Sequence, residues 1–386
     1  MKKNENPQPM DRRKFLGAAG GSLLAAAAVP AATLAASAHP SARSNRPVIG
    51  KESAEQSSSV TPEKLRKIPI GVFDPVYADL SIDAMLDRVT ALGLEAMEIG
   101  TGGYPDNKHC PLDELVGDRA KAKAWQKKFT DRNIQVATLS CHGNPIHPDP
   151  KHAAKDAETF RNTVLLAEML DVKVIVGFSG CPGGAPGDTQ PNWITYRWPP
   201  EYATALDWQW KEKVVPYWKQ AAKFARDHGI RRLAFEMHPN FVVYNPRTLM
   251  RLREAVGEEI GANNDLSHLF WQGCDPVEVI HFLGKQGAIY HAHMKDTVFF
   301  PENVNRYGVL NFSFEASDLA LASETFRAVG YGHSASLWKS ILQAYMDVGY
   351  EGILSIENED PILSGPVGVE RAAYVLKNVR NELLGA

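Results

Sequence analysis

The sequence has little cysteine and no surplus of charge of either sign. Its 386 residues include four cysteines, which lie far apart and form no Cys-x-x-Cys pair. This spacing disfavours a thiolate zinc site, and we interpret the four residues as isolated buried thiols. Forty-two basic side chains against 45 acidic ones give a net charge of -3. Such a balance provides no electrostatic footprint for nucleic acid or for an anionic membrane.

The first 38 residues have the features of a bacterial export signal. Arg12 and Arg13 are adjacent, and no residue from Phe15 to Ala38 is charged. The stretch is rich in alanine and glycine, and Ala36-Ser37-Ala38 offers the small-x-small pattern of a cleavage site. We therefore predict a twin-arginine signal peptide at residues 1–38, read by the twin-arginine export machinery, and a periplasmic or extracellular protein. An uncleaved membrane anchor is the alternative, although the many alanines make this segment poor in insertion energy.

The remainder of the chain predicts a linker and one barrel domain. Residues 39–66 are rich in serine, proline and charge without hydrophobic periodicity, which predicts a disordered linker. Beyond them, short apolar runs alternate with amphipathic stretches, as in repeated strand–helix units. We predict eight strands, at residues 68–74, 94–100, 134–141, 172–180, 231–238, 260–265, 288–296 and 351–359. Eight such units predict a single (β/α)8 TIM barrel over residues 67–386, with its last helix near 366–383.

Two predicted loops are longer than ordinary connections, and both follow strands. The loops at residues 181–207 and 297–337 share a richness in aromatic residues, including Trp193, Tyr196, Trp198, Tyr202, Phe299, Phe300 and Tyr307. Loops that follow the strands form the catalytic face of such a barrel. These aromatics could therefore stack against the faces of a sugar, or they could pack the insertions onto the rim.

Polar residues occur at the carboxyl ends of four predicted strands, where a barrel covered on both sides should be apolar. Side chains alternate with a period of two, so the polar members of each strand face one way. These members are Glu236 and His238 in the fifth strand, Asp265 at the tip of the sixth, His291, His293 and Lys295 in the seventh, and Glu357 in the eighth. We expect them to line the barrel mouth, while Leu233, Phe235, Met237, Tyr290, Ala292 and Met294 pack on the outer helices.

Ionisable groups in such positions are rarely buried unless they are paired or bound to a metal. Glu236, Asp265, His293 and Glu357 offer three carboxylates and one imidazole from four successive strand tips. This donor set suits one divalent ion, Mn2+ or Mg2+ first, with Co2+ or Zn2+ as alternatives. A network of buried salt bridges that uses Lys295 is the competing interpretation.

Other histidines lie at or near strand tips. His142, which follows the third strand in the run LSCHGNP, is expected to contact substrate or to act as an acid or base. For His238 and His291 three roles stay open: supporting the metal ligands, contacting the substrate, or simply packing. Glu359 is expected at the solvated rim.

These motifs resemble the xylose isomerase-like TIM-barrel family, the sugar isomerase and epimerase group that includes D-tagatose 3-epimerase, over roughly residues 68–383. The matching pieces are Glu236 in FEMHP, Asp265 and His268 in NDLSHL, His293 in HAHMKD, and Glu357 in LSIENED. The resemblance implies that the two glutamates, Asp265 and His293 hold one metal, and that the glutamates also move protons. It also implies that His268 approaches the substrate. We predict that His142, His238, His291 and Lys295 complete the substrate-binding set.

The implied activity is isomerisation or epimerisation of a sugar or keto-sugar through an enediolate, with Glu236 and Glu357 exchanging the proton. The same enediolate could expel a β-leaving group, which would make the protein a 3-keto-glycoside lyase. Apurinic endonucleases resemble this barrel but need extra histidines after the fourth strand, where this chain has Phe178-Ser179-Gly180-Cys181, so no nucleic acid is expected. A barrel that binds carbohydrate without converting it is the remaining alternative, and an assembly of identical subunits stays open.

Overall fold

The computed structural model describes residues 68–104, 106–313 and 316–385. The predicted signal peptide at 1–38 and the predicted linker at 39–66 lie outside these ranges. Within them, no helix combines the length and the apolar character that crossing a bilayer requires.

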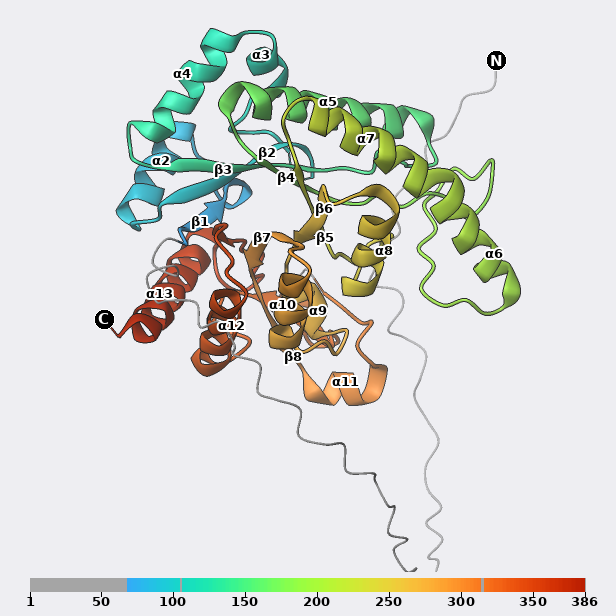
Figure 1. Ribbon diagram of the computed structural model, residues 1–386. Coiled ribbons are helices and arrows are strands. Elements are labelled where there is room, and N and C mark those ends of the chain that lie inside the picture. The colour runs from blue at the N-terminus through green and yellow to red at the C-terminus, as the bar shows by residue number, and fades with distance from the viewer. Residues whose placement is uncertain (1–67, 105, 314–315, 386) are drawn as a thin grey trace, which may run out of the picture. The chain divides into compact units, whose positions relative to one another are not determined.

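Eight parallel strands form a closed barrel in the order β1-β10-β7-β6-β5-β4-β3-β2 (Figure 1). The strands are β1 Ile70–Phe73, β2 Ala96–Gly103, β3 Gln135–His142, β4 Val174–Gly177, β5 Arg232–Glu236, β6 Ile260–Asn263, β7 Ile289–Met294 and β10 Leu354–Ile356. Each overlaps the range predicted from its apolar run, because a strand covered on both faces must be nearly all apolar. The predicted TIM barrel is confirmed.

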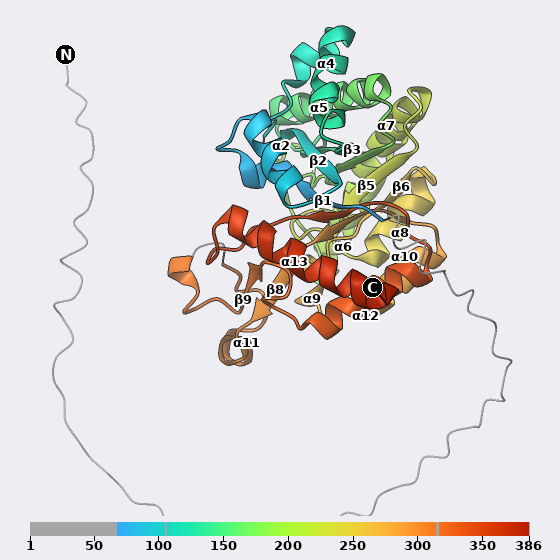
Figure 2. The same ribbon diagram turned by 90° about the vertical axis from the view of Figure 1, so that its left-hand side faces the viewer.

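Helices follow the strands along the chain and cover the outside of the barrel (Figures 1 and 2). They are α2 Ile82–Ala91, α3 Leu112–Val116, α4 Arg119–Thr130, α5 Pro150–Leu170, α6 Pro200–Trp208, α7 Val215–Asp227, α8 Pro246–Val256, α9 Ser267–Phe270, α10 Pro276–Lys285, α12 Ala335–Asp347 and α13 Gly365–Leu384. Short helical turns lie at Asp74–Tyr77 (η2) and Gln209–Val214 (η3). The start of α5 is set by Asp149, whose side chain accepts a hydrogen bond from the Lys151 amide, and by Pro150 in the first turn.

The predicted alternation of strand faces is confirmed in β5. Leu233 and Phe235 belong to the main core, whereas Ala234 belongs to a separate cluster with Val174 and Val176. In β7 the prediction was wrong for Tyr290, which packs against that second cluster. The pairing of β6 with β7 shifts register between Ala262 and Asn263, so strict alternation does not hold at this point.

The long loop after β7 has secondary structure of its own. Strands β8 Asp296–Phe299 and β9 Glu324–Arg327 form an antiparallel ribbon, with α11 Pro301–Tyr307 and the turn η4 Ala316–Asp318 between them (Figure 2). Asp296 is fully buried, and its Oδ2 accepts hydrogen bonds from the amides of Gly330, Gly332 and His333. This carboxylate therefore fixes the end of the insertion next to the barrel mouth.

The long loop after β4 is held at its base by Gln209, which is buried in η3. Its amide nitrogen donates to the carbonyl oxygens of Gly183, at 3.0 Å, and Asn192, at 2.6 Å.

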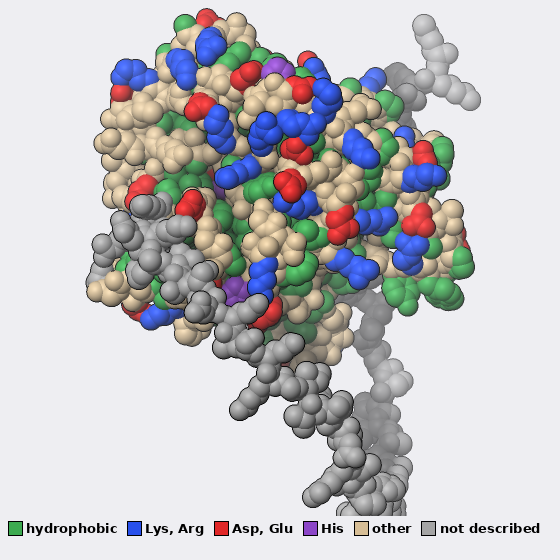
Figure 3. Space-filling view, in the orientation of Figure 1, with side chains coloured by type: hydrophobic (Ala, Val, Ile, Leu, Met, Phe, Trp, Pro, Cys, Tyr) green, Lys and Arg blue, Asp and Glu red, His purple; other side chains and the backbone are tan. Residues whose placement is uncertain are grey.

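On the face of the molecule shown in Figure 3, basic and acidic side chains are interspersed, in keeping with the near-zero net charge. The four cysteines are free thiols, as predicted; three are buried, and Cys274 is partly exposed.

Candidate metal and substrate site

Four side chains from four neighbouring strands meet at the carboxyl end of the barrel. Glu236 ends β5, Asp265 follows β6, His293 lies in β7, and Glu357 directly follows β10. One ligand atom from each lies within 4.8 Å of the others. The parallel strands of a barrel end at one rim, and this common rim is what brings together residues spread over more than a hundred positions.

The separations within this cluster suit one bound cation. His293 Nδ1 lies 3.0 Å from Glu357 Oε2, 3.4 Å from Glu236 Oε2 and 3.7 Å from Asp265 Oδ2. Ligand–ion bonds of about 2.0–2.6 Å allow ligand atoms to stand up to about 5 Å apart. Asp265 Oδ2 is buried and lies 3.1 Å from the Lys295 ammonium, so it is an oxygen placed to face a cation. The residues fit a divalent metal.

Lys295 lies against the same carboxylates. Its Nζ is 2.7 Å from Glu357 Oε2, 3.0 Å from Glu359 Oε2 and 3.1 Å from Asp265 Oδ2. Glu359 is thus an ion-pair partner that lines the cavity, while a quarter of its side chain stays exposed, as expected for a residue at the rim. With Glu236, four carboxylates surround one ammonium group, so a salt-bridge network alone leaves an excess of buried negative charge.

Three of the four ligand residues have pKa values shifted toward their charged forms. Burial alone would raise the pKa of Glu236, but His142 and His268 outweigh it and lower that pKa well below its usual range. Burial opposes ionisation of Asp265 as well, and Lys295 and His268 nevertheless lower its pKa. For His293, burial favours the neutral ring, but Glu98 and Glu357 raise its pKa well above the ordinary value.

Glu98 in β2 is part of this site, and sequence reasoning missed it. Its Oε2 accepts hydrogen bonds from His291 Nε2 at 2.7 Å, His293 Nε2 at 3.0 Å and Ser355 Oγ at 2.7 Å. Binding Nε2 of His293 leaves Nδ1 facing the three carboxylates, which orients the ring as a metal ligand requires. The signal was present, because Glu98 is an acidic residue inside an otherwise apolar buried strand.

The other predicted histidines differ in their surroundings. His268 is buried, with Nε2 3.0 Å from Glu236 Oε1. His142 is also buried; its Nε2 lies 3.4 Å from Glu236 Oε2, and its Nδ1 has no hydrogen-bond partner among the described residues. His238 donates from Nδ1 to the Pro239 carbonyl, and burial together with His268 lowers its pKa to about 3, so it is neutral. His291 is bound to Glu98.

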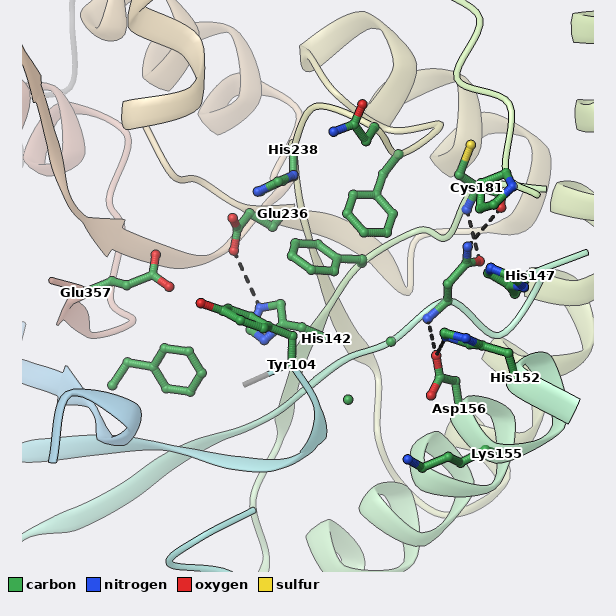
Figure 4. Close-up of a pocket in the computed structure, with 18 of the residues that line it drawn as sticks. Tyr104, His142, His147, His152, Lys155, Asp156, Cys181, Glu236, His238 and Glu357 are labelled. Carbon is green, nitrogen blue, oxygen red and sulfur yellow. Dashed lines mark hydrogen bonds and ion pairs between the residues drawn. The ribbon is translucent and has the colours of Figure 1, made fainter. Parts of the chain in front are cut away.

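A cavity of about 1090 Å³ lies over the cluster (Figure 4). Of the predicted site residues it is lined by His142, Glu236, His238, Lys295 and Glu357. The metal ligands Asp265 and His293 lie beneath it. His268 and His291, which were predicted to bind substrate, do not line it either and instead contact Glu236 and Glu98. The aromatic walls are Phe73, Tyr104, Phe178 and Phe241.

The aromatics predicted from the long loops do not line this cavity. Tyr196 and Trp198 are 73% and 68% exposed, and Trp193 lines a separate pocket with Tyr244. Of the two interpretations left open for these aromatics, stacking against a sugar in this cavity is therefore not supported. The aromatic residues that line the cavity include Phe73 and Phe178, which come directly from the ends of β1 and β4.

The profile of the xylose isomerase-like TIM-barrel family matches residues 86–379. The chain belongs to this family. A sequence relative is the uncharacterized protein YfiH of Bacillus subtilis (strain 168), 37% identical over 306 residues, which cover 77% of this chain and 95% of that protein.

Solved structures share the fold of this family member. The IolI protein with a bound zinc atom has a TM-score of 0.55 and 17% identity, covering 82% of this chain and 98% of IolI. D-psicose 3-epimerase with D-tagatose, from Clostridium cellulolyticum H10, has a TM-score of 0.53 and 14% identity, covering 80% and 99%. The shared architecture is that of metal-dependent sugar epimerases, combined here with a buried cluster that could hold an ion.

Proposed function

We propose that the protein is a divalent-metal-dependent sugar isomerase or epimerase that works by proton transfer between two glutamates. The observation that carries the proposal is the four-ligand cluster, because two of its carboxylates, Glu236 and Glu357, also line the large cavity. Relatives crystallised with zinc and with a ketose support the same conclusion. The twin-arginine signal and an exported location stay predictions from the sequence.

Glu236, Asp265, His293 and Glu357 would hold the metal. Carboxylate oxygens with one imidazole suit Mn2+ or Mg2+, and Co2+ or Zn2+ are alternatives. A bound divalent ion supplies Lewis-acid stabilisation of the negative charge that develops when a C–H beside a carbonyl loses its proton. Lys295 neutralises part of the carboxylate charge in the absence of the ion.

The two glutamates are placed to move that proton. Glu236 ends β5 and Glu357 follows β10, and two other strands separate these in the barrel, so their carboxylates approach the cavity from different sides. Figure 4 shows Glu236 and Glu357 facing the same space. One carboxylate takes the proton from carbon, and the other returns a proton to the resulting enediolate. Return to the opposite face gives an epimer, and return to the neighbouring carbon gives an isomer.

Two histidines would orient the substrate. His142 and His238 line the cavity; His142 Nδ1 has no hydrogen-bond partner among the described residues, and Nε2 has only the 3.4 Å contact with Glu236 Oε2. A sugar hydroxyl or carbonyl oxygen could satisfy them, because buried polar groups are normally hydrogen-bonded. Phe73 and Phe178, whose rings lie against His142, offer apolar faces for the sugar carbons.

A second candidate is a lyase that cleaves 3-keto-glycosides from the same enediolate. The observation in its favour is the size of the cavity, about 1090 Å³, because most ligand pockets measure about 300–1000 Å³. A single hexose would leave part of this space empty, whereas a glycoside would fill more of it. Protonation of the departing glycosidic oxygen would then replace return of the proton to carbon.

The deciding experiment follows metal-loaded protein by NMR in D2O with ketoses, aldoses, 3-keto-sugars and 3-keto-glycosides. An epimerase or isomerase puts one deuterium on the product carbon, whereas a lyase releases a free alcohol. Glu357→Gln should lower turnover at least about a hundredfold while KM changes less than about tenfold, and the exposed Glu370→Gln on α13 is the control. Tight sugar binding with no deuterium uptake and no released fragment would mean a carbohydrate-binding protein instead.

A further inference from the structure

The cavity has a second end, away from the metal cluster. It extends to the loop before α5 and to the first two turns of that helix. The lining residues there are His147 in the loop and Lys151, His152, Lys155 and Asp156 on the helix. Figure 4 shows Glu357 and Glu236 on one side, and His147, His152 and Lys155 on the other, with His142 and Tyr104 between them. The wall between the two ends includes Gly103 and Gly143, which add no side chain to the space. We call the far end the α5 end.

The two ends differ in the sign of their charge. Glu236, Glu357 and Glu359 make the cluster end acidic, and a divalent ion bound there would neutralise it. Lys151 and Lys155 supply positive charge at the α5 end, and neither makes an ion pair within the described residues. Two ammonium groups whose charge no neighbouring carboxylate takes up can attract an anion.

Asp156 is the acidic residue that lines the α5 end, but its carboxylate already has partners. Its Oδ2 accepts a hydrogen bond from the Asn144 amide at 2.6 Å and lies 3.0 Å from His152 Nε2. The residue is only 7% exposed. Its charge is therefore shared with His152 and the backbone, which leaves both lysines free for a ligand.

His147 adds a neutral donor to the α5 end. Its Nδ1 accepts a hydrogen bond from the Asp149 amide, so the proton of the neutral ring resides on Nε2. Burial, followed by the neighbouring His152, lowers the pKa of His147, which keeps this ring neutral. One N–H donor and two ammonium groups then surround the same end of the cavity, and these are the groups that bind an oxyanion.

We propose that the α5 end is a subsite for an anionic substituent, so that the substrate is a sugar carrying a carboxylate or a phosphate at the end remote from the reacting carbons. This inference rests on the proposed function, because it needs the reacting part of the sugar at the metal cluster. The cavity's volume leaves room for such a group beyond a single sugar ring. Lys151 and Lys155 bind it, and His147 donates to it.

The test measures binding to metal-loaded protein by calorimetry, with ligands that differ only at C6. They are D-fructose, D-fructuronate, D-fructose 6-phosphate and 6-amino-6-deoxy-D-fructose. We expect an anionic ligand to bind at least about tenfold more tightly than fructose, and the amino sugar to bind more weakly than fructose. The preference should fall as salt is added. Comparing the two anions distinguishes a carboxylate from a phosphate as the natural group.

The double variant Lys151→Gln/Lys155→Gln should abolish the preference while its affinity for fructose stays within about twofold of wild type. Lys219→Gln/Lys285→Gln removes the same charge outside the cavity, and it should keep the preference. Equal binding of all four ligands by wild type, or a preference that survives in the first variant, would overturn the subsite. Binding of none of the four sugars would overturn the sugar site itself, and the subsite with it.

Discussion

The two ends of the cavity are built in different ways. The metal cluster stands on the ends of barrel strands, where its side chains are almost fully buried and contact one another at 3.0–3.7 Å. The α5 end stands on the surface of a helix and the loop before it, and both of its lysines are exposed. A rigid, buried site can fix the geometry of a metal and a reacting carbon, whereas exposed lysines can only select for charge. Chemistry and selectivity are thus separable in this cavity.

The largest expected effect is loss of the metal from the cluster end. Asp265 is fully buried and its carboxylate faces the other ligand atoms of the cluster, so Asp265→Ala should abolish binding of about one divalent ion per chain. The measurement is metal content after dialysis against Mn2+ or Zn2+. Asp156→Asn, at the α5 end, should keep the ion. Retention of a full equivalent by Asp265→Ala would remove the basis for the metal site.

Glu98→Gln should weaken the cluster end next. The carboxylate holds His291, His293 and Ser355, and removing its charge leaves the His293 ring without its anionic support. Loss of such a contact typically weakens metal binding about 10–100-fold, and breaking a buried ion pair costs about 3–5 kcal/mol of stability. Titration calorimetry and urea unfolding would measure both.

Glu324→Gln is the matched control for that change. Burial raises the pKa of the Glu324 carboxyl group to about 8, so this group is already largely neutral at pH 7. Its replacement should therefore cost less stability than Glu98→Gln and leave metal affinity unchanged. Equal losses in the two variants would contradict a specific role for Glu98.

Metal affinity should rise with pH. Burial would lower the pKa of His293, but Glu98 and Glu357 raise it well above the model-peptide value of about 6.5. The ring is then protonated at neutral pH, and it must lose that proton before Nδ1 can bind an ion. Affinity should increase up to about tenfold per pH unit between about pH 6 and pH 8, with proton release visible in buffers of different ionisation enthalpy. A flat profile would show that His293 is not a ligand.

The smallest effect is expected at the α5 end. Because Lys151 and Lys155 are exposed and unpaired within the described residues, Lys151→Gln/Lys155→Gln should keep the metal equivalent and shift Tm by less than about 2 °C. Differential scanning calorimetry and metal analysis would measure this. A large fall in either quantity would mean that the two ends are not separable.

Much of the cluster end could be predicted from the sequence because the barrel imposes a simple geometry. Glu236, His293 and Glu357 are polar residues in apolar runs, and parallel strands bring their ends to one rim. Glu98 follows the same rule and was missed because it lies in β2, outside the four strand tips considered. Tyr290 was misplaced because a shift in strand pairing interrupts the alternation of faces.

The α5 end could not be predicted in the same way. Lys151 and Lys155 lie on an amphipathic helix, where lysine is an ordinary solvated residue and the sequence has no period that marks a cavity. The same limit applies to Trp198 and Tyr196, since aromatic content does not tell which way a long loop turns its side chains.

The sequence by itself determined the eight strand–helix units and the carboxylates and histidine at their ends, because hydrophobic periodicity is local and an ionisable group in a buried run is conspicuous. The tertiary structure alone decided that Glu98 supports His293, that Lys295 lies among the carboxylates, and that the cavity extends to α5. These contacts join residues up to 195 positions apart. They depend on the register of strands around the barrel and on the path of its loops. No local sequence pattern predicts that register or that path.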